Sequence, residues 1–220
     1  MQKLLVLLMT IAISLATSPV ALKGKNFPNL VENQETKTFN LSPFNSVKTF
    51  QAIEVEIVKS DVEKAEVSSN YLSDVKIEVK NKTLYIQYKP NVSLKNPNTK
   101  VIVYAKDLAK VDAENASSVK VKSIFDNAEQ TFECQSAGKI VANSKASVVH
   151  INAESASEFS GKIEAKNVTI NATSASKINL SGTTNTIKVE ATSLAKVNLE
   201  ELKYNNIQKK TGSLAKIYTQ

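Results

Sequence analysis

The sequence predicts an all-β fold in which short parallel strands coil into a solenoid with rungs of about 19 to 21 residues. A short repeated pattern fills the C-terminal half of the chain. Its copies open at Ala113, Cys134, Ala153, Ala172, Ala191 and Thr211, so the openings are 21, 19, 19, 19 and 20 residues apart. A period of this length is typical of solenoids, in which each repeat buries its apolar face only by stacking on its neighbours.

Apolar and polar residues alternate within each repeat. In the repeat that opens at Ala172, the residues Val168, Ile170 and Ala172 occupy alternate positions, and Ile178 and Leu180 alternate again after a small turn. Alternation buries one face of a strand, and the same columns stay apolar in successive repeats. A spacing of two residues argues against a helical repeat, and a propeller blade would need ~40 residues.

The chain before the repeats divides into three parts. Residues 1–16 carry Lys3, an apolar run and small residues near Ala16, which predicts a signal peptide cleaved after Ala16. Residues 17–38 contain Pro, Gly and Asn without a period, so we expect a flexible spacer. Residues 39–220 are expected to form one domain, with irregular strands over 39–110 and regular repeats over 111–220. Strands are expected at 50–58, 75–79, 84–88 and 100–104, and an exposed loop at 90–98.

The N-terminal segment predicts export to the periplasm, the outer cell envelope or the extracellular space. Cleavage near Ser18 or Ala21 is an alternative, and so is an uncleaved membrane anchor, although the apolar run is shorter than the ~20 residues that a bilayer core needs. After cleavage we expect no transmembrane span.

The chain is basic and its positive charge comes from lysine alone. It has 28 basic residues against 21 acidic ones, a net charge of +7 and a pI near 9.3. Specific phosphate and base recognition depends largely on the planar arginine side chain, so we predict no nucleic-acid partner. The expected partner is an anionic polysaccharide or another cell-surface component.

Two polar columns accompany the repeated turns. The first holds Ser or Asn at 115, 136, 155, 174, 193 and 213, and we expect these side chains to form tight turns and stack into a ladder. The second is interrupted by Ser118 and Glu158, and it supplies the predicted binding residues Lys139, Lys177, Lys196 and Lys216. A solvated edge is the alternative interpretation of this lysine column, and the loop at 90–98 is an alternative contact region.

The residues offer little for catalysis. His150 is the only histidine and alternates with apolar neighbours, so it is expected on the surface. Cys134 is the only cysteine and takes a place that Ala fills in other repeats, so it is expected to be buried and inert. We therefore expect no metal site, no cofactor and no catalytic residue. An alternative is a polysaccharide-acting enzyme that uses Glu154 and Glu158, which flank one turn.

Several segments together resemble the auto-transporter adhesin family whose members carry a head GIN domain. They are Phe44-Asn45-Ser46-Val47, Leu84-Tyr85-Ile86, Val101-Ile102-Val103-Tyr104, Leu108-Ala109-Lys110-Val111 and the repeated Ser-Ala-Ser-Lys turns. The resemblance covers roughly 39–218, although this family usually has Gly in the turns where this chain has Ala or Leu. It implies a right-handed parallel β-helix-like fold and an exported, envelope-associated protein without transferable catalytic residues.

These observations lead to one main hypothesis. The chain is expected to be a non-enzymatic adhesin or envelope-associated scaffold that binds through exposed strand faces and loops. A structural protein that associates weakly end to end through its last strands is the remaining alternative, because a solenoid end exposes unpaired backbone groups.

Overall fold

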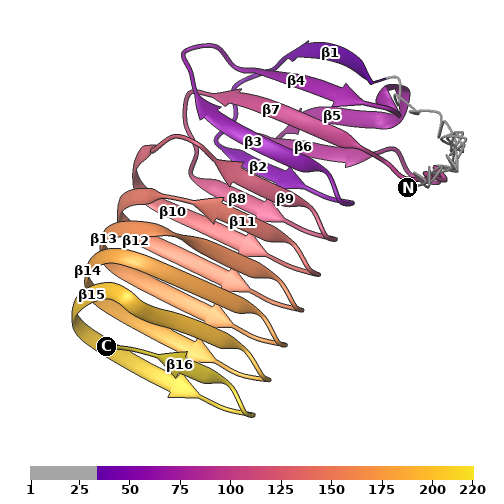
Figure 1. Cartoon of the computed structure of the whole chain (residues 1–220). Coiled ribbons are helices and arrows are strands. Elements are labelled where there is room, and N and C mark those ends of the chain that lie inside the picture. Colours follow the sequence, from indigo (N-terminus) through magenta and orange to yellow (C-terminus); the bar gives the residue numbers. More distant parts are fainter. Residues whose placement is uncertain (1–33) are drawn as a thin grey trace, which may run out of the picture. The chain divides into compact units, whose positions relative to one another are not determined.

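The computed structural model describes residues 34–220, which are built almost entirely of strands stacked side by side (Figure 1). The expected signal peptide at 1–16 and the expected spacer up to residue 33 lie outside the described residues. Within 34–220, no helix has the length and apolar character of a membrane span. The predicted β-solenoid is confirmed.

The elements follow one another closely along the chain. They are β1 (Glu35–Asn40), β2 (Ser46–Thr49), β3 (Glu54–Lys59), β4 (Lys64–Ser69), the 3-10 helix η1 (Leu72–Asp74), β5 (Val75–Lys80), β6 (Thr83–Tyr88), β7 (Thr99–Ala105), β8 (Lys110–Ala113), β9 (Ser118–Val121), β10 (Asp126–Cys134), β11 (Lys139–Ala142), β12 (Ser144–Ala153), β13 (Glu158–Ala172), β14 (Lys177–Ala191), β15 (Lys196–Thr211) and β16 (Lys216–Tyr218).

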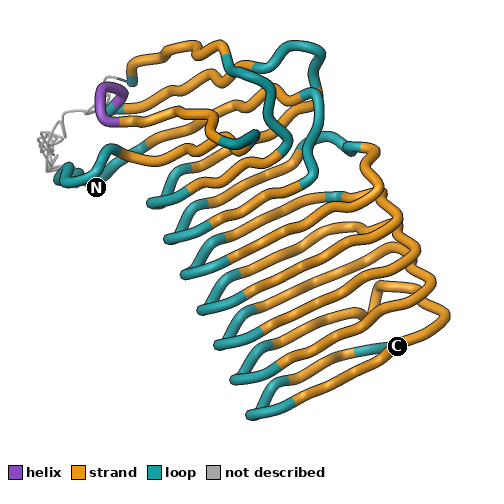
Figure 2. The backbone as a smooth tube through the Cα atoms, turned by 180° about the vertical axis from the view of Figure 1, so that it is seen from behind, coloured by secondary structure: helices purple, strands orange, loops and turns teal. Residues whose placement is uncertain are grey.

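Each rung has two faces, and in every rung except that of β6 and β7 a tight turn joins them at one edge (Figure 2). We call face A the parallel ladder through β7, β3, β9, β11, the first residues of β13, β14 and β15, and β16. Face B is the parallel ladder through β6, β2, β8, β10, β12 and the later parts of β13, β14 and β15. The strands β13, β14 and β15 belong to both faces because each continues around the edge opposite the tight turns.

Every tight turn between the two faces contains two consecutive residues with positive φ. This is the geometry of a type I′ turn, which a bond from the fourth residue to the first closes. Ser117 donates such a bond from its N–H to the carbonyl of Glu114 at 3.1 Å. The pairs are Gln51-Ala52, Asn115-Ala116, Ser136-Ala137, Ser155-Ala156, Ser174-Ala175, Ser193-Leu194 and Ser213-Leu214.

The turns are also bonded to one another. The second residue of each pair except the last donates its N–H to the carbonyl of the first residue in the next turn, as from Ala137 to Ser155 at 2.9 Å and from Leu194 to Ser213 at 3.0 Å. The Ser and Asn column therefore forms the tight turns as predicted. The ladder between turns, however, is made by backbone groups rather than by the expected side-chain contacts, because positive φ aims these groups along the stack.

The core lies between the two faces and follows the predicted columns. The side chains of Ile140, Phe159 and Ile178 are fully buried in one such column. Phe159 also contacts Phe132 of face B, with ring centroids 5.1 Å apart. Inward alternation from both faces thus builds one continuous apolar core, which is the main source of stability in a chain without disulfides.

The N-terminal strands are more regular than the sequence suggested. The strands β2 and β3 pair in parallel with β8 and β9 and form a rung of the same kind as the later repeats. The strands β6 and β7 form a further rung outside β2 and β3, and the loop at 90–98 replaces its tight turn. Antiparallel pairing is confined to β1 with β4, β4 with β7, and β5 with β6. The stack therefore begins before residue 111, and chain order differs from spatial order at this end.

Two expected boundaries differ from the structure. Residues 35–38, placed in the spacer, form the first part of β1, which lies antiparallel on β4. The first four side chains of β1 are all exposed, so the strand shows no alternation of buried and exposed residues that would predict it. The strand expected at 50–58 begins only at Glu54, because Gln51 and Ala52 form a tight turn.

Candidate binding surface

The predicted lysine column is a straight, exposed row on face A. Lys139 lies between Ser118 and Glu158 in register, and Lys177, Lys196 and Lys216 follow on successive rungs. Neighbouring strands lie about 4.8 Å apart, so the ammonium groups project from the surface at that repeat. The structure thus brings together the four lysines that the sequence singled out.

Their partners divide the four lysines into one paired and three free groups. Lys139 forms an ion pair with Glu158 at 3.2 Å. Within residues 34–220, no carboxylate lies within ion-pair distance of Lys177, Lys196 or Lys216. Three like charges on adjacent rungs repel one another, so this part of face A favours contact with an anion.

A shallow polar hollow of about 460 Å³ lies on face A beside the free lysines. Side-chain amides, hydroxyls and two charged groups line it, together with the backbone at Gly161. The polar lining residues are Asn143, Ser160, Lys162, Asn179, Ser181, Asn198 and Glu201. Such a lining offers both donors and acceptors to a hydroxyl-rich ligand.

Glycine and a bulge shape this hollow. A Cβ at Gly161 would lie 1.7 Å from the carbonyl oxygen of Ala142, and a Cβ at Gly182 would lie 2.2 Å from that of Ile163. The missing side chains therefore let adjacent rungs approach each other here. The register of β14 with β15 also shifts between Asn179 and Ser181, where the longer rung of β15 accommodates an additional residue.

Glu154 and Glu158, the two carboxylates of the alternative enzyme hypothesis, lie on different faces of the solenoid. Glu154 is exposed at the end of face B, before the turn, whereas Glu158 follows the turn on face A and contacts Lys139. Retaining and inverting glycosidases need two carboxylates that face one reaction centre. The structure shows no contact that joins these two side chains, and Glu158 is already paired.

The structure also describes the surroundings of Cys134, His150 and the loop at 90–98, which the sequence singled out. Cys134 is fully buried, and burial raises the pKa of its thiol far above the ordinary range. His150 is half-exposed on face B and lies 3.4 Å from Glu129. The loop at 90–98 is mostly exposed and is attached to η1 through Tyr71, whose hydroxyl donates to the carbonyl of Lys95 at 3.0 Å. In the described range, no three His, Cys, Asp or Glu residues are grouped to hold a metal.

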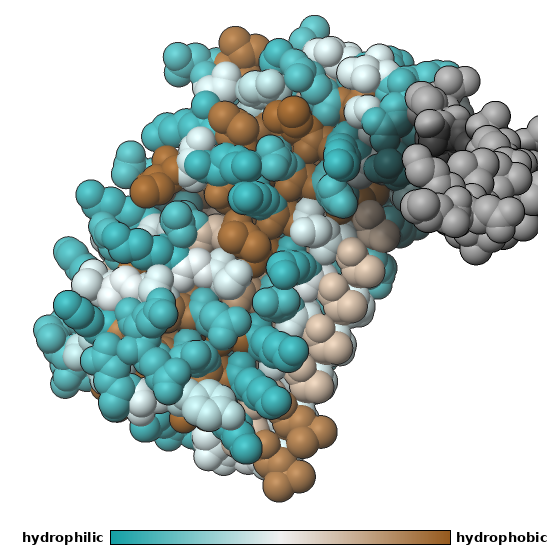
Figure 3. Space-filling view, viewed as in Figure 1, coloured by the Kyte–Doolittle hydropathy of each residue, from teal (hydrophilic) through white to brown (hydrophobic). Residues whose placement is uncertain are grey.

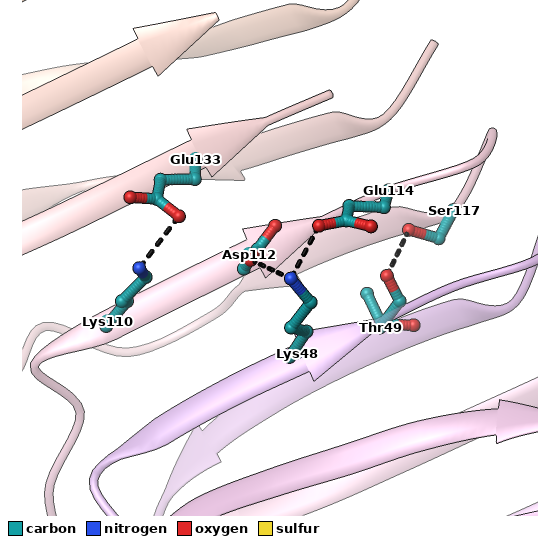
Figure 4. A network of polar contacts seen from close by, with 7 residues as sticks. All are labelled: Lys48, Thr49, Lys110, Asp112, Glu114, Ser117 and Glu133. Carbon is teal, nitrogen blue, oxygen red and sulfur yellow. Dashed lines mark hydrogen bonds and ion pairs between the residues drawn. The ribbon is translucent and has the colours of Figure 1, made fainter. Parts of the chain in front are cut away.

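Face B carries an ion-pair network that the sequence did not reveal (Figure 4). Lys48 of β2 contacts Asp112 at 2.8 Å and Glu114 at 2.5 Å. Lys110 contacts Glu133 at 2.7 Å on the next rung. A hollow of about 260 Å³ lies beside these groups. The network was missed because it depends on the pairing of β2 with β8, and these two strands are far apart in sequence.

Asp112 is the most unusual member of this network. Its side chain is only 4% exposed, and its Oδ1 atom is buried without a hydrogen-bond partner. Burial raises the pKa of this carboxyl above its ordinary value, although the hydrogen bond and charge of Lys48 oppose the change. Burial lowers the pKa of Lys48, but its bonds to Asp112 and Glu114 outweigh this effect and raise the pKa to about 12. The arrangement stabilises a charged lysine and disfavours an ionised aspartate.

The fold and these surfaces define a β-solenoid with exposed polar faces. The family model described as "Putative auto-transporter adhesin, head GIN domain" matches residues 43–220, and the chain belongs to this family. The resemblance noted from the sequence is thereby confirmed. No curated protein matches the chain in sequence.

Solved structures share the fold at low sequence identity. A "putative lipid binding protein" from Parabacteroides distasonis has a TM-score of 0.67 and 16% identity, covering 86% of this chain and 97% of its own. A "putative adhesin" from the same species has a TM-score of 0.61 and 18% identity, covering 85% and 94%. A "putative adhesin" from Parabacteroides merdae has a TM-score of 0.53 and 14% identity, covering 85% and 96%. At these identities the similarity establishes the fold alone.

Proposed function

We propose that the protein is an exported, non-enzymatic binding module that holds an acidic polysaccharide on face A. The observation that carries this proposal is the row of Lys177, Lys196 and Lys216, which lies beside the polar hollow without ion-pair partners in the described chain. Membership of an adhesin family supports a role in surface binding. The apolar run at the N-terminus supports export to the periplasm, the outer envelope or the extracellular space.

The geometry suits a chain of sugars better than a single small ligand. Adjacent rungs repeat at about 4.8 Å, which is close to the length of one pyranose unit, so successive lysines can contact successive acidic groups. The amides of Asn179 and Asn198 lie two residues after Lys177 and Lys196 on the same face. They can bond to sugar hydroxyls while the lysines neutralise carboxylates or sulfates.

Retention on immobilised polysaccharides tests the proposal. We expect the protein to be retained on acidic polysaccharides and released by salt, because the contact is mainly electrostatic and exposed. Replacing Lys177, Lys196 and Lys216 together by Gln should abolish retention. The matched control replaces Lys166, Lys188 and Lys203, which are exposed lysines outside the row, and removes the same charge. If both variants lost retention equally, the binding would depend only on the net charge of the protein, which would contradict a defined site.

A catalytic role on polysaccharides has weaker support, because Glu154 and Glu158 lie on different sides of a turn. Replacing both by Gln should leave polysaccharide retention unchanged, and the unmodified protein should not shorten the chains it binds. Chain cleavage that the double variant loses would instead establish the enzyme. The weak end-to-end association expected from the sequence remains a prediction, which concentration-dependent sedimentation can test.

A further inference from the structure

The tips of the tight turns form an exposed ridge along one edge of the solenoid, visible in Figure 3 as a row of tan atoms that descends the right-hand side and ends in brown atoms at the bottom. Each tip is the second positive-φ residue of its turn. The two turns nearest the C-terminus carry Leu, with exposed fractions of 56% at Leu194 and 81% at Leu214. From β8 onward the tips are Ala116, Ala137, Ala156, Ala175, Leu194 and Leu214.

The two leucines are unfavourable for the isolated protein. Leu194 and Leu214 have φ values of 67° and 64°, a region that residues with a Cβ rarely adopt. Their side chains also leave apolar surface in water. Ala156 and Ala175 form the same turn with a smaller side chain, so turn geometry does not require leucine. Exposed leucines on a strained backbone therefore point to contact with an apolar phase or partner.

Lysines lie beside the leucine tips on face A. Lys196 and Lys216 follow Leu194 and Leu214 by two residues and lie at the base of the tips on face A. The chain from 177 to 220 contains seven lysines and three glutamates, so this end of the solenoid is strongly basic. Apolar tips with a basic surrounding are typical of surfaces that bind anionic lipids.

Much of the backbone of the ridge is bonded within the protein, which lowers the cost of leaving water. Leu194 donates its N–H to the carbonyl of Ser213 at 3.0 Å, and Ala195 donates to the carbonyl of Thr192 at 3.1 Å. Ala215 closes the last turn by donating to Gly212 at 3.1 Å. Backbone groups in an apolar phase must find internal partners. These three N–H groups have them, whereas the N–H of Leu214 has none in the described chain and would remain at the headgroup level.

We propose that this edge docks on an anionic lipid bilayer. Leu194 and Leu214 enter the boundary between headgroups and acyl chains, while Lys196 and Lys216 contact lipid phosphates. A second copy of the chain fits less well, because the ridge is convex and one residue wide. Two such ridges would bury far less than the ~1,000 Å² that a stable protein interface needs. A bilayer adapts to a narrow ridge and supplies the charge that the lysines complement.

Vesicle flotation tests the docking. The probes are phosphatidylcholine vesicles with and without phosphatidylglycerol. We expect the protein to float with the anionic vesicles and to dissociate in high salt. Replacing Leu194 and Leu214 by Ala should lower the partition coefficient by at least roughly tenfold, and the variant should fold because Ala occupies the other tips. Ala137→Ser with Ala156→Ser is the matched control and should bind normally. Equal binding of the leucine variant and the unmodified protein would overturn the proposal.

A fluorescent reporter gives a second, independent result. The chain contains no tryptophan, so Leu214→Trp introduces a single fluorophore at the tip. Its emission should move to shorter wavelength with anionic vesicles and should be quenched by brominated lipids, whereas Ala116→Trp at the far end of the ridge should change less. An unchanged spectrum for Leu214→Trp would overturn insertion. A dimer that disappears on changing both leucines to Ala, without vesicle binding, would assign the ridge to self-association instead.

The leucine variant also separates this inference from the proposed polysaccharide site. Leu194 and Leu214 lie on the turn edge rather than on face A, so their replacement by Ala should leave polysaccharide retention intact. Loss of vesicle binding with normal retention is the expected outcome. Failure of retention in the unmodified protein would contradict the proposed function and leave the vesicle result to stand alone.

Discussion

Lys48 Nζ lies 2.8 Å from Asp112 Oδ2, and this pair joins β2 to β8 across the point where the chain returns to the stack. The side chain of Lys48 is 27% exposed, whereas that of Asp112 is almost completely buried. A charge in this environment is tolerated only when a partner compensates for lost hydration. Lys48 therefore offsets part of the cost of burying Asp112 at the junction between the N-terminal rungs and the regular repeats.

Replacing Lys48 should show how much of the cost of burying the Asp112 carboxylate it offsets. We expect Lys48→Met to lower the free energy of unfolding by about 3 kcal/mol near neutral pH, because it leaves a buried, unpaired carboxylate. The loss should shrink as the pH falls, because removing Lys48 takes away the hydrogen bond and charge that hold the pKa of Asp112 down, so the folded variant takes up a proton at a higher pH than the folded unmodified protein. Urea unfolding at several pH values measures both effects. Adding Asp112→Asn should recover most of the loss, and a pH-independent loss would contradict this account.

The same pair predicts a loss of stability in alkali. The pKa of Lys48 is raised from 10.5 to about 12 in the folded protein. A raised lysine pKa contributes stability that is complete below pH 10.5 and is lost as the pH rises through about 12. Side-chain NMR titration should show Lys48 releasing its proton later than exposed lysines. Asp112→Asn should lower the pKa of Lys48, and an unchanged value would show that Glu114 alone is responsible.

Two neighbouring positions on β14 should differ greatly in their sensitivity to the same substitution. Ile178 is fully buried and Lys177 is exposed beside it. Ile178→Asp should lower the free energy of unfolding by about 4 kcal/mol, because it places an unpaired charge between apolar columns. Lys177→Asp should change it by less than about 0.5 kcal/mol. Thermal unfolding of the two variants measures the difference, and equal stability would mean that inward and outward columns are wrongly assigned.

The repeats allowed the columns of the C-terminal rungs to be predicted, because each of them recurs at a constant spacing. Ile178 and Lys177 could be assigned to opposite sides from alternation alone. The rung of β2 and β3 was missed because its turn at Gln51 and Ala52 stands far from the next turn at 115, with β4 to β7 inserted between them. Pairing at such a distance leaves no local signal, and the pair of Lys48 and Asp112 was hidden for the same reason.

The surface could be predicted only in part. The lysine column follows from the repeat, whereas the hollow depends on the close approach of rungs at Gly161 and on the bulge in β15. Neither feature recurs in the sequence. The exposure of Leu194 and Leu214 also needed the structure, since apolar residues in a repeat are expected to be buried unless the turn is known to point outward.

Glycine at a turn tip should stabilise the solenoid. Ala175 has a φ of 62°, a conformation that costs residues with a Cβ roughly 1 kcal/mol relative to glycine. Ala175→Gly should therefore raise the free energy of unfolding by up to about 0.5 kcal/mol, because the greater freedom of glycine in the unfolded chain offsets part of the gain. Ala172→Gly, at a buried strand position without positive φ, should lower it by about 1 kcal/mol. Chemical denaturation compares the two, and destabilisation by Ala175→Gly would contradict strain at the tips.

Gly161 affects both the stability of the stack and the shape of the proposed polysaccharide site. In Gly161→Ala, the new Cβ would lie 1.7 Å from the carbonyl oxygen of Ala142, so β11 and β13 would have to separate. We expect the free energy of unfolding to fall by about 3 kcal/mol and polysaccharide retention to weaken as the hollow changes shape. Gly212→Ala is the control, because its Cβ would meet only Thr192 Cγ2 at an ordinary 3.7 Å. Both variants should fold, and equal stability would show that rung spacing at Gly161 does not depend on the absent side chain.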